Sequence, residues 1–247
     1  MGKRMRIGLG SALAIEFKEG LLESSVFKGI NKCGYDGQVT SHYAYLAGVG
    51  ANYFQESESC GICVRISTSR SLVARVVDQC EECGETSLSL DAAAFAKLND
   101  TSVPARWHFV KCERSPNISL QWQEDSNNHF AALKVLHGME PTVQLHYKDH
   151  SGHWILASQD FDSSFILLAI EKQVHLKLVS MSGVELIHTI PYRAGGTIPI
   201  EKQYSGEPGE ALPFPTQLDV GSTEPNHASA LPLLTHFPIL LFLLAFD

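Results

Sequence analysis

The positions of the cysteines constrain this chain more than any other feature, because all of them lie in its first half. The six are Cys33, Cys60, Cys63, Cys80, Cys83 and Cys112. An even number within one short stretch is typical of three disulfides in an exported domain, or of a metal site in a cytosolic domain. This stretch is therefore expected to form a small domain that depends on its cysteines.

Zinc is the alternative to disulfides. Two C-x-x-C pairs, Cys60 with Cys63 and Cys80 with Cys83, are spaced as in a zinc ribbon. A four-cysteine zinc site would leave two cysteines without a role, whereas three disulfides use all six. Disulfides are therefore favoured, with their connectivity left open, and neither a metal nor another cofactor is expected. The zinc alternative predicts bound zinc and six reduced thiols.

Composition and charge exclude several classes of protein. The chain has 247 residues, of which 44% are hydrophobic and 19% charged, as in a globular protein with one large domain or two small ones. The formal net charge is −8, and no basic stripe interrupts it. Because an acidic surface repels phosphate backbones, a nucleic-acid partner is not expected.

Changes in composition divide the chain into five segments. They are a weak or incomplete targeting segment at 1–24, a cysteine-containing domain at 25–113, a cysteine-free domain at 117–205, a linker rich in Pro, Gly and Ser at 206–229, and an apolar tail at 230–247. The low periodicity of the fourth segment is typical of a linker.

The two ends of the chain bear on its location. The basic N-terminus precedes a short apolar stretch that makes a poor signal peptide. The tail at 230–247 is shorter than a spanning helix, lacks a basic flank and follows small polar residues, which is the pattern of a removable GPI-anchor signal. A buried C-terminal helix is the alternative. With sequons at Asn99 and Asn117, these features predict an extracellular or cell-surface location and a tail that attaches the chain to a membrane.

Hydrophobic periodicity predicts mainly strands. In the cysteine-containing domain, alternating or continuous apolar runs predict strands at 64–66, 73–77 and 106–110. One short helix is predicted at 91–98, with Asp91 as its N-cap. In the cysteine-free domain, runs that include 143–148 and 174–178 alternate cleanly and recur about every ten residues, which favours a β-sandwich.

Several motifs in a fixed order resemble one family. They lie at 76–83, 88–90, 94–98, 106–112, 128–135 and 184–191. Together they resemble the expansin family, in particular its microbial expansin-like members, over about residues 25–205. The resemblance implies an all-β protein, with a six-stranded double-psi β-barrel and a short helix followed by an immunoglobulin-like β-sandwich that together form one long groove. It also implies a monomer that binds cellulose, xyloglucan or related glucans and loosens cell walls without hydrolysis.

The resemblance assigns roles to residues of the barrel. Asp78 is the expected groove carboxylate, whereas the second carboxylate of the family falls on Ser89 and is missing. Asp91 lies nearby but is expected to cap the helix. The threonine of the first strand falls on Val26. Because inverting hydrolysis needs two carboxyl groups about 6.5–9.5 Å apart, the chain is not expected to be an enzyme.

In the sandwich, the resemblance assigns a row of sugar-stacking aromatic side chains to His129, Phe130 and Phe161. Their polar neighbours favour an exposed edge, and the alternative is that both phenylalanines are core residues. Two other functions remain open beside wall loosening. One is a divergent glycoside hydrolase similar to family-45 endoglucanases, and the other is a surface protein that binds carbohydrate without loosening it.

Overall fold

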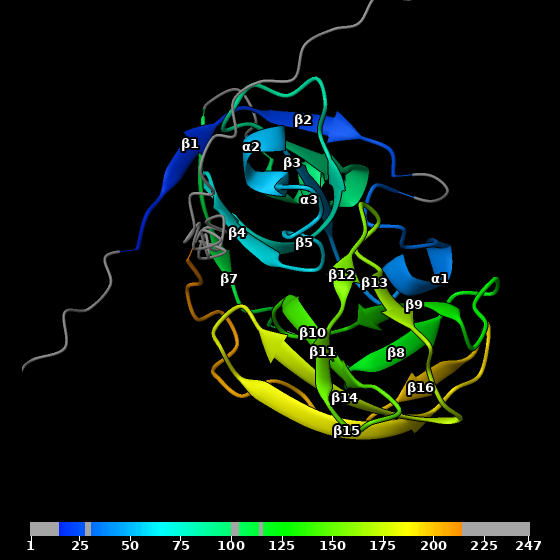
Figure 1. The fold of residues 1–247 in the computed structure, drawn as a ribbon. Coiled ribbons are helices and arrows are strands. Elements are labelled where there is room, and N and C mark those ends of the chain that lie inside the picture. Colours follow the sequence, from blue (N-terminus) through cyan, green and yellow to red (C-terminus); the bar gives the residue numbers. More distant parts are fainter. Residues whose placement is uncertain (1–14, 28–30, 100–103, 114–115, 214–247) are drawn as a thin grey trace, which may run out of the picture. The chain divides into compact units, whose positions relative to one another are not determined.

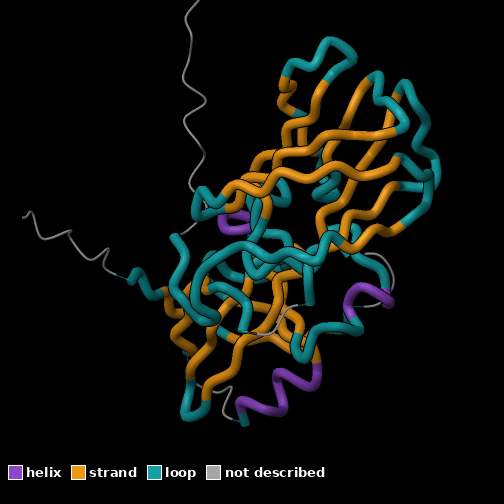
Figure 2. The backbone as a smooth tube through the Cα atoms, turned by 90° about the horizontal axis from the view of Figure 1, so that it is seen from below, coloured by secondary structure: helices purple, strands orange, loops and turns teal. Residues whose placement is uncertain are grey.

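Two hydrophobic cores organise the part of the chain that the structure describes. The structure is a computed structural model, and it describes residues 15–27, 31–99, 104–113 and 116–213 (Figure 1). One core is enclosed by a seven-stranded sheet, and the other is built from residues of a four-stranded and a five-stranded sheet. Strands and loops make up most of the trace, and the helices are short (Figure 2). The predicted all-β class is therefore confirmed.

The seven-stranded sheet closes on itself as a barrel, in the order β1-β7-β4-β5-β3-β6-β2. Its strands are β1 (Lys18–Gly20), β2 (Leu22–Ser25), β3 (Leu46–Val49), β4 (Cys63–Ser67), β5 (Ser71–Gln79), β6 (Leu88–Asp91) and β7 (Ala105–Val110). The edge strands β1 and β2 are separated only by Leu21, whose carbonyl accepts a hydrogen bond from the N–H of Leu88 at 3.0 Å. Counted as one interrupted strand, they give the six strands predicted.

Alternating apolar residues build the barrel core. Val64 and Ile66 of β4 and Trp107 and Phe109 of β7 are fully buried. The indole N–H of Trp107 donates to the carbonyl of Thr86 at 2.8 Å, so this buried polar group is satisfied. The strands predicted at 64–66, 73–77 and 106–110 are confirmed as β4, β5 and β7.

Three helices occur among the described residues of the barrel. They are α1 (Gly37–Thr40), α2 (Ala51–Phe54) and α3 (Ala92–Leu98). Asp91 caps α3, because its Oδ1 accepts a hydrogen bond from the N–H of Ala94 at 2.9 Å. Asn99 ends the helix in the left-handed conformation with φ 57°. The predicted helix and its cap are confirmed.

All six cysteines form disulfides, and the zinc alternative is wrong. The pairs are Cys33–Cys60, Cys63–Cys112 and Cys80–Cys83. The Cys80–Cys83 disulfide joins the two cysteines of one C-x-x-C pair. The two cysteines of the other pair, Cys60 and Cys63, form separate disulfides with distant cysteines. Those two links are buried, whereas Cys80 and Cys83 are half-buried.

The remaining strands form two facing sheets, which confirms the predicted sandwich. Their orders are β11-β10-β14-β15 and β12-β13-β9-β8-β16. The strands are β8 (Ser119–Trp122), β9 (Phe130–Leu136), β10 (Thr142–Lys148), β11 (Trp154–Leu156), β12 (Ser158–Gln159), β13 (Phe165–Leu168), β14 (Gln173–Ser180), β15 (Glu185–Pro191) and β16 (Thr197–Pro199). In β14, buried Val174, Leu176 and Leu178 alternate with outward polar residues, as predicted.

The ends of the described part differ from two predicted boundaries. The barrel includes β1 and so begins before residue 25. Residues 209–212, predicted to be part of a linker, return to β7, where the N–H of Leu212 donates to the carbonyl of Phe109 at 2.9 Å. The predicted targeting residues 1–14, the linker beyond 213 and the tail lie outside the described residues. Within the described ranges, no helix is both long and apolar enough to cross a membrane.

Candidate functional site

Asp78 lies near the end of β5 and is held there by backbone donors. Its Oδ1 accepts hydrogen bonds from the N–H of Lys32 at 2.9 Å and of Gln79 at 3.0 Å. The Lys32 ammonium lies 2.8 Å from the Glu81 carboxylate in an exposed ion pair. One Asp78 oxygen is thus fixed by the protein, and within the described part of the chain the other has no hydrogen-bond partner.

The register of the barrel places Asp78 and Ser89 on either side of a glycine. Gly48 of β3 pairs with Asp78 on β5 and with Ser89 on β6. A Cβ added at Gly48 would clash with the Ser89 hydroxyl, which shows that the serine lies directly over this glycine. Ser89, where the resemblance implies a second carboxylate, therefore lies on the strand next to that of Gly48 and two strands from Asp78. It offers a hydroxyl in place of a carboxylate.

Of two acidic residues near Ser89, Asp91 has its expected role and Glu23 was missed. Asp91 is committed to capping α3, so it does not take the place of the missing carboxylate. Val26 lies beyond β2 and is 69% exposed, and the residue of the first strand that pairs with Ser89 is Glu23. The assignment of the first-strand position to Val26 is therefore wrong. The alternation of buried Leu22 with exposed Glu23 was the available sequence signal.

The disulfide loop at 80–83 borders this row of residues. An oxygen of Glu23 and the Sγ atoms of Cys80 and Cys83 all lie within 4.8 Å of one another. These atom types can ligate a metal, but both sulfurs are bonded to each other, so no thiolate is available to do so. In the oxidised protein, the loop at 80–83 follows Asp78 in the chain and lies beside Glu23.

The three predicted aromatic positions of the sandwich are exposed. Phe161 is 77% exposed and Phe130 is 44% exposed, and His129 is exposed as well. The alternative that both phenylalanines are core residues is therefore wrong. Asn127 shapes the turn before β9, because its Oδ1 accepts hydrogen bonds from the N–H groups of His129 and Phe130 at 2.9 and 3.1 Å. Leu168, which pairs with Phe130 and is 56% exposed, extends this apolar surface and was not predicted.

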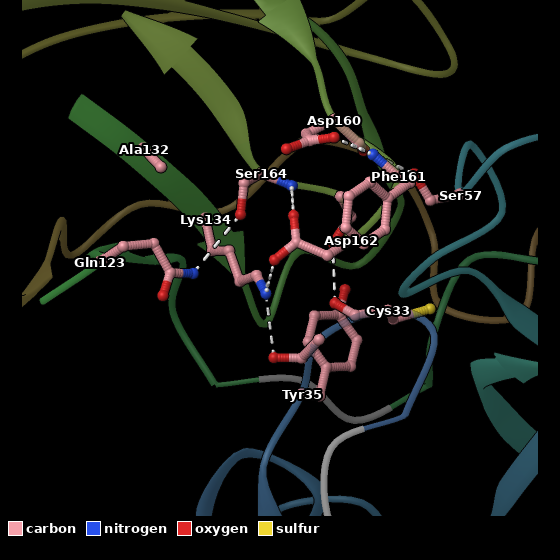
Figure 3. A network of polar contacts seen from close by, with 12 residues as sticks. Cys33, Tyr35, Ser57, Gln123, Ala132, Lys134, Asp160, Phe161, Asp162 and Ser164 are labelled. Atoms are coloured by element: carbon pink, nitrogen blue, oxygen red, sulfur yellow. Dashed lines mark hydrogen bonds and ion pairs between the residues drawn. The ribbon is translucent and has the colours of Figure 1, made fainter. Parts of the chain in front are cut away.

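A buried lysine holds the loop that carries Phe161. The Nζ of Lys134 on β9 lies 2.7 Å from Asp162 Oδ2 and donates to the carbonyl of Gly34 at 3.0 Å (Figure 3). Burial alone would raise the pKa of Asp162, but hydrogen bonds from Lys134 and Ser164 outweigh it and lower this pKa overall. The carboxylate and the ammonium thus stabilise each other in a place from which water is largely excluded.

Two further hydrogen bonds fix the same loop against the barrel. The hydroxyl of Ser163 donates to the carbonyl of Cys33, and that of Ser57 donates to the carbonyl of Asp160, both at 3.1 Å (Figure 3). Cys33 follows Lys32, whose N–H holds Asp78. The short barrel segment at 32–34 therefore contacts both the loop of Phe161 and the carboxylate of Asp78.

Phe130 lies farther along the same face. It is four residues from Lys134 on β9, and residues two and four apart on a strand share a face. At about 3.3 Å per residue, the backbone of Phe130 stands about 13 Å from the backbone of Lys134, whose side chain meets the Phe161 loop. The structure thus links Phe161 to Asp78 through neighbouring contacts and leaves His129 and Phe130 at the opposite end of β9.

The larger hollow of the barrel is separate from the candidate site. A hollow of about 560 Å³ lies elsewhere on the barrel, where Tyr43, Tyr45 and Lys97 are among its lining residues. Neither Asp78 nor any of the three aromatic positions lines it. Phe130 and Phe161 are exposed instead, which suits an extended ligand better than a small molecule that must be enclosed.

Fold and site together define a class of protein. It has a closed, disulfide-linked β-barrel with an aspartate at a strand end, and a β-sandwich that exposes aromatic side chains. Residues 31–111 match the model of the Barwin family. Expansin-like protein 3 of Dictyostelium discoideum is 25% identical over 173 residues, which are 64% of this chain and 52% of that protein. Expansin-like protein 1 of the same organism is 26% identical over 117 residues, 42% of this chain and 41% of that protein.

Solved structures share the fold. The expansin of Clavibacter michiganensis matches with a TM-score of 0.70 as a mutant in complex with cellohexaose, at 15% identity, and 0.69 as the apo protein, at 14% identity. Each match covers 77% of this chain and 99% of the solved chain. These findings confirm the resemblance to expansins and the fold of a double-psi barrel with a β-sandwich. The chain spans about half the length of the curated relatives it matches.

Proposed function

We propose that this protein binds cell-wall polysaccharide, in particular cellulose and associated glucans such as xyloglucan, and loosens it without hydrolysis. The observation that carries the proposal is the exposure of Phe161 beside the barrel segment that holds Asp78. A solved expansin of the same fold has been crystallised with cellohexaose, which supports a glucan as the ligand class. Binding to a chain of neutral sugars needs neither a metal nor a cofactor.

The side chains present suit this ligand. The CH groups of a sugar ring pack on the flat face of an aromatic ring, and Phe130 and Phe161 offer such faces to solvent. The second oxygen of Asp78 has no hydrogen-bond partner among the described residues, so it can accept a hydrogen bond from a sugar hydroxyl. Aromatic stacking supplies affinity, and the carboxylate orients the chain of sugars.

The chemistry of the barrel row supports a function without hydrolysis. Hydrolysis of a glycosidic bond by inversion requires one carboxyl group to protonate the leaving oxygen and another to activate water. Ser89 cannot replace the acid, because its hydroxyl does not ionise in the needed range. A hydrolase is the second candidate, since Glu23 brings another carboxylate to the same face of the barrel. A surface protein that only binds carbohydrate is the third.

The proposed setting is the cell surface or the extracellular space. Three disulfides persist where the surroundings are oxidising, which supports export. Asn99 and Asn117 are both exposed, as glycosylation would require. The apolar tail at 230–247 is proposed as a GPI-anchor signal, and the protein is proposed to act as a monomer.

One experiment separates the three functions. The full chain, made under oxidising conditions, is mixed with insoluble cellulose, and depletion from solution, reducing ends and extension of a wall strip under load are measured. Depletion and extension without new reducing ends support the proposal. Reducing ends that the Asp78→Asn variant no longer produces would establish a hydrolase instead. Depletion without extension would leave only carbohydrate binding.

A further inference from the structure

We propose that Glu23 supplies the second sugar-contacting carboxylate of the barrel, in place of the one that Ser89 cannot provide. The proposal rests on the polysaccharide binding proposed above and adds a selectivity for neutral glucans over polymers that carry carboxylates. It is carried by the pairing of four strands, by the contacts of the Glu23 side chain and by the small residues that lie between the two acids.

The pairing places both acids in one row across the sheet. Glu23 on β2 pairs with Ser89 on β6, Ser89 pairs with Gly48 on β3, and Gly48 pairs with Asp78 on β5. Paired residues on neighbouring strands point to the same face of a sheet. Leu88, which pairs with Leu22, is fully buried in the core, so the residues of this row point away from the core.

The side chain of Glu23 reaches toward the Asp78 end of the row. Its carboxylate lies within 4.8 Å of both sulfurs of the Cys80–Cys83 disulfide, and Cys80 follows Asp78 by two positions. Neighbouring strands are about 4.8 Å apart, so three strand steps separate the backbones of the two acids by about 14 Å before either side chain is counted. The Glu23 side chain shortens this gap, because its carboxylate lies beside the disulfide of Cys80.

The floor between the two carboxylates is made of the smallest side chains. Gly48 has none, and the buried Ser89, which is 5% exposed, adds only a CH₂–OH group. A methyl group at Gly48 would already meet that hydroxyl, so the backbone forms the floor here. The paired residues between the two acids therefore carry small side chains, and the Cys80–Cys83 disulfide lies beside the Glu23 end of the row.

Both acids have acceptor oxygens to offer. Among the described residues, no hydrogen bond or ion pair engages the exposed Glu23 carboxylate or the second oxygen of Asp78. The neighbouring acids are engaged, because Glu81 pairs with Lys32 and Glu19 with Arg106. Hydrogen bonds from hydroxyls to carboxylates are stronger than those to neutral acceptors. Two carboxylates beside a bound sugar chain also repel a uronate in that chain.

The test compares Glu23→Gln with Asp78→Asn in the full oxidised chain, using cellohexaose binding measured by calorimetry. Glu19→Gln is the matched control, since it removes an exposed carboxylate from the adjoining strand without touching the row. Each variant of the row is expected to bind cellohexaose about fivefold more weakly, because a neutral acceptor replaces a charged one. Glu19→Gln is expected to bind like the wild type. An oligogalacturonate is expected to bind better to both row variants than to the wild type.

The outcomes distinguish this proposal from the function on which it rests. If Glu23→Gln binds both oligosaccharides like the wild type while Asp78→Asn binds cellohexaose more weakly, Glu23 has no role in binding. The proposed polysaccharide binding would then still stand. A wild-type chain that binds no cellohexaose would overturn the proposed function itself. Melting temperatures of all variants are compared with the wild type, and an unchanged value for Glu23→Gln assigns its effect to the ligand contact.

Discussion

Phe161 carries much of the proposed binding at the scale of single residues. Replacing it by alanine removes an exposed ring that supports nothing else, so stability is expected to be unchanged and adsorption to cellulose to fall about fivefold, equivalent to about 1 kcal/mol. Phe130→Ala is expected to have a similar effect. Trp154→Ala is the matched control, because Trp154 is an exposed aromatic residue on the other sheet. Equal losses in all three variants would show that adsorption is nonspecific.

Single residues also mark the limit of prediction from sequence. Asp78 and Phe130 could be assigned because each lies inside a motif that resembles the family, and the exposure of Phe130 and Phe161 could be predicted from their polar neighbours. Glu23 could not, because no motif anchors β2, and a short strand can shift by several residues in an alignment without changing its character. Its role depends on pairing with Ser89, which lies far along the chain.

At the scale of elements, α3 depends on its cap. Asp91 satisfies an otherwise unpaired N–H at the start of the helix, so Asp91→Ala is expected to lower the free energy of unfolding by about 1 kcal/mol, whereas Asp91→Asn retains most of it. Urea denaturation of the variants measures this. If Asp91→Ala instead left stability unchanged and weakened cellohexaose binding, Asp91 would belong to the sugar-binding row and its assignment as a cap would fail.

The three disulfides are expected to differ in reactivity. Cys80–Cys83 closes a loop with a sequence separation of 3 and is half-buried, whereas Cys33–Cys60 has a separation of 27 and is buried. A small dithiol is therefore expected to open Cys80–Cys83 first, as alkylation and mass spectrometry would show. Loop-closure entropy predicts that removing this link costs roughly 2 kcal/mol, against roughly 4 kcal/mol for Cys33–Cys60. Simultaneous reduction of both links would contradict this order.

Elements show why local patterns predict strands better than they predict topology. The alternation within β10 and β14 is a property of a few neighbouring residues, and both strands were predicted from it. The closure of the barrel, the pairing of the cysteines and the return of residues 209–212 to β7 depend on contacts between distant segments. Composition wrongly predicted that residues 209–212 belong to a linker. Gly and Pro are common in packed turns as well as in flexible linkers, so composition does not distinguish the two.

At the scale of the whole molecule, buried polar groups join the barrel to the sandwich. Arg75 of β5 donates to the carbonyl of Gly138 at 3.1 Å, and the hydroxyl of Tyr43 lies 3.1 Å from Nδ1 of His137. Lys134 and Asp162 add a buried ion pair. Removing one partner of such a pair leaves a buried charge without compensation, at a cost of about 3 kcal/mol. These contacts hold the Phe161 loop against the segment that positions Asp78.

His137 makes this contact region sensitive to acid. Burial, together with the nearby His42 and Arg75, lowers the pKa of His137 to about 4 from its ordinary value of 6.5. Below pH 6.5 the unfolded chain binds a proton at this histidine, whereas the folded protein keeps it neutral. The contribution of His137 to the free energy of unfolding is therefore complete above pH 6.5 and is lost as the pH falls toward 4. Between pH 6.5 and pH 5, this histidine alone is expected to reduce stability by about 2 kcal/mol.

An asparagine at this position isolates the effect of His137. His137 has a φ of 62°, which asparagine tolerates well, and an amide oxygen can accept the hydrogen bond from Tyr43 without titrating. The unfolding midpoint of His137→Asn is therefore expected to change less between pH 7 and pH 5 than that of the wild type. His108 and His146, whose pKa values burial also lowers, act in the same direction in both proteins and cancel in the comparison. An equal pH dependence in the two proteins would assign the acid sensitivity to those other histidines.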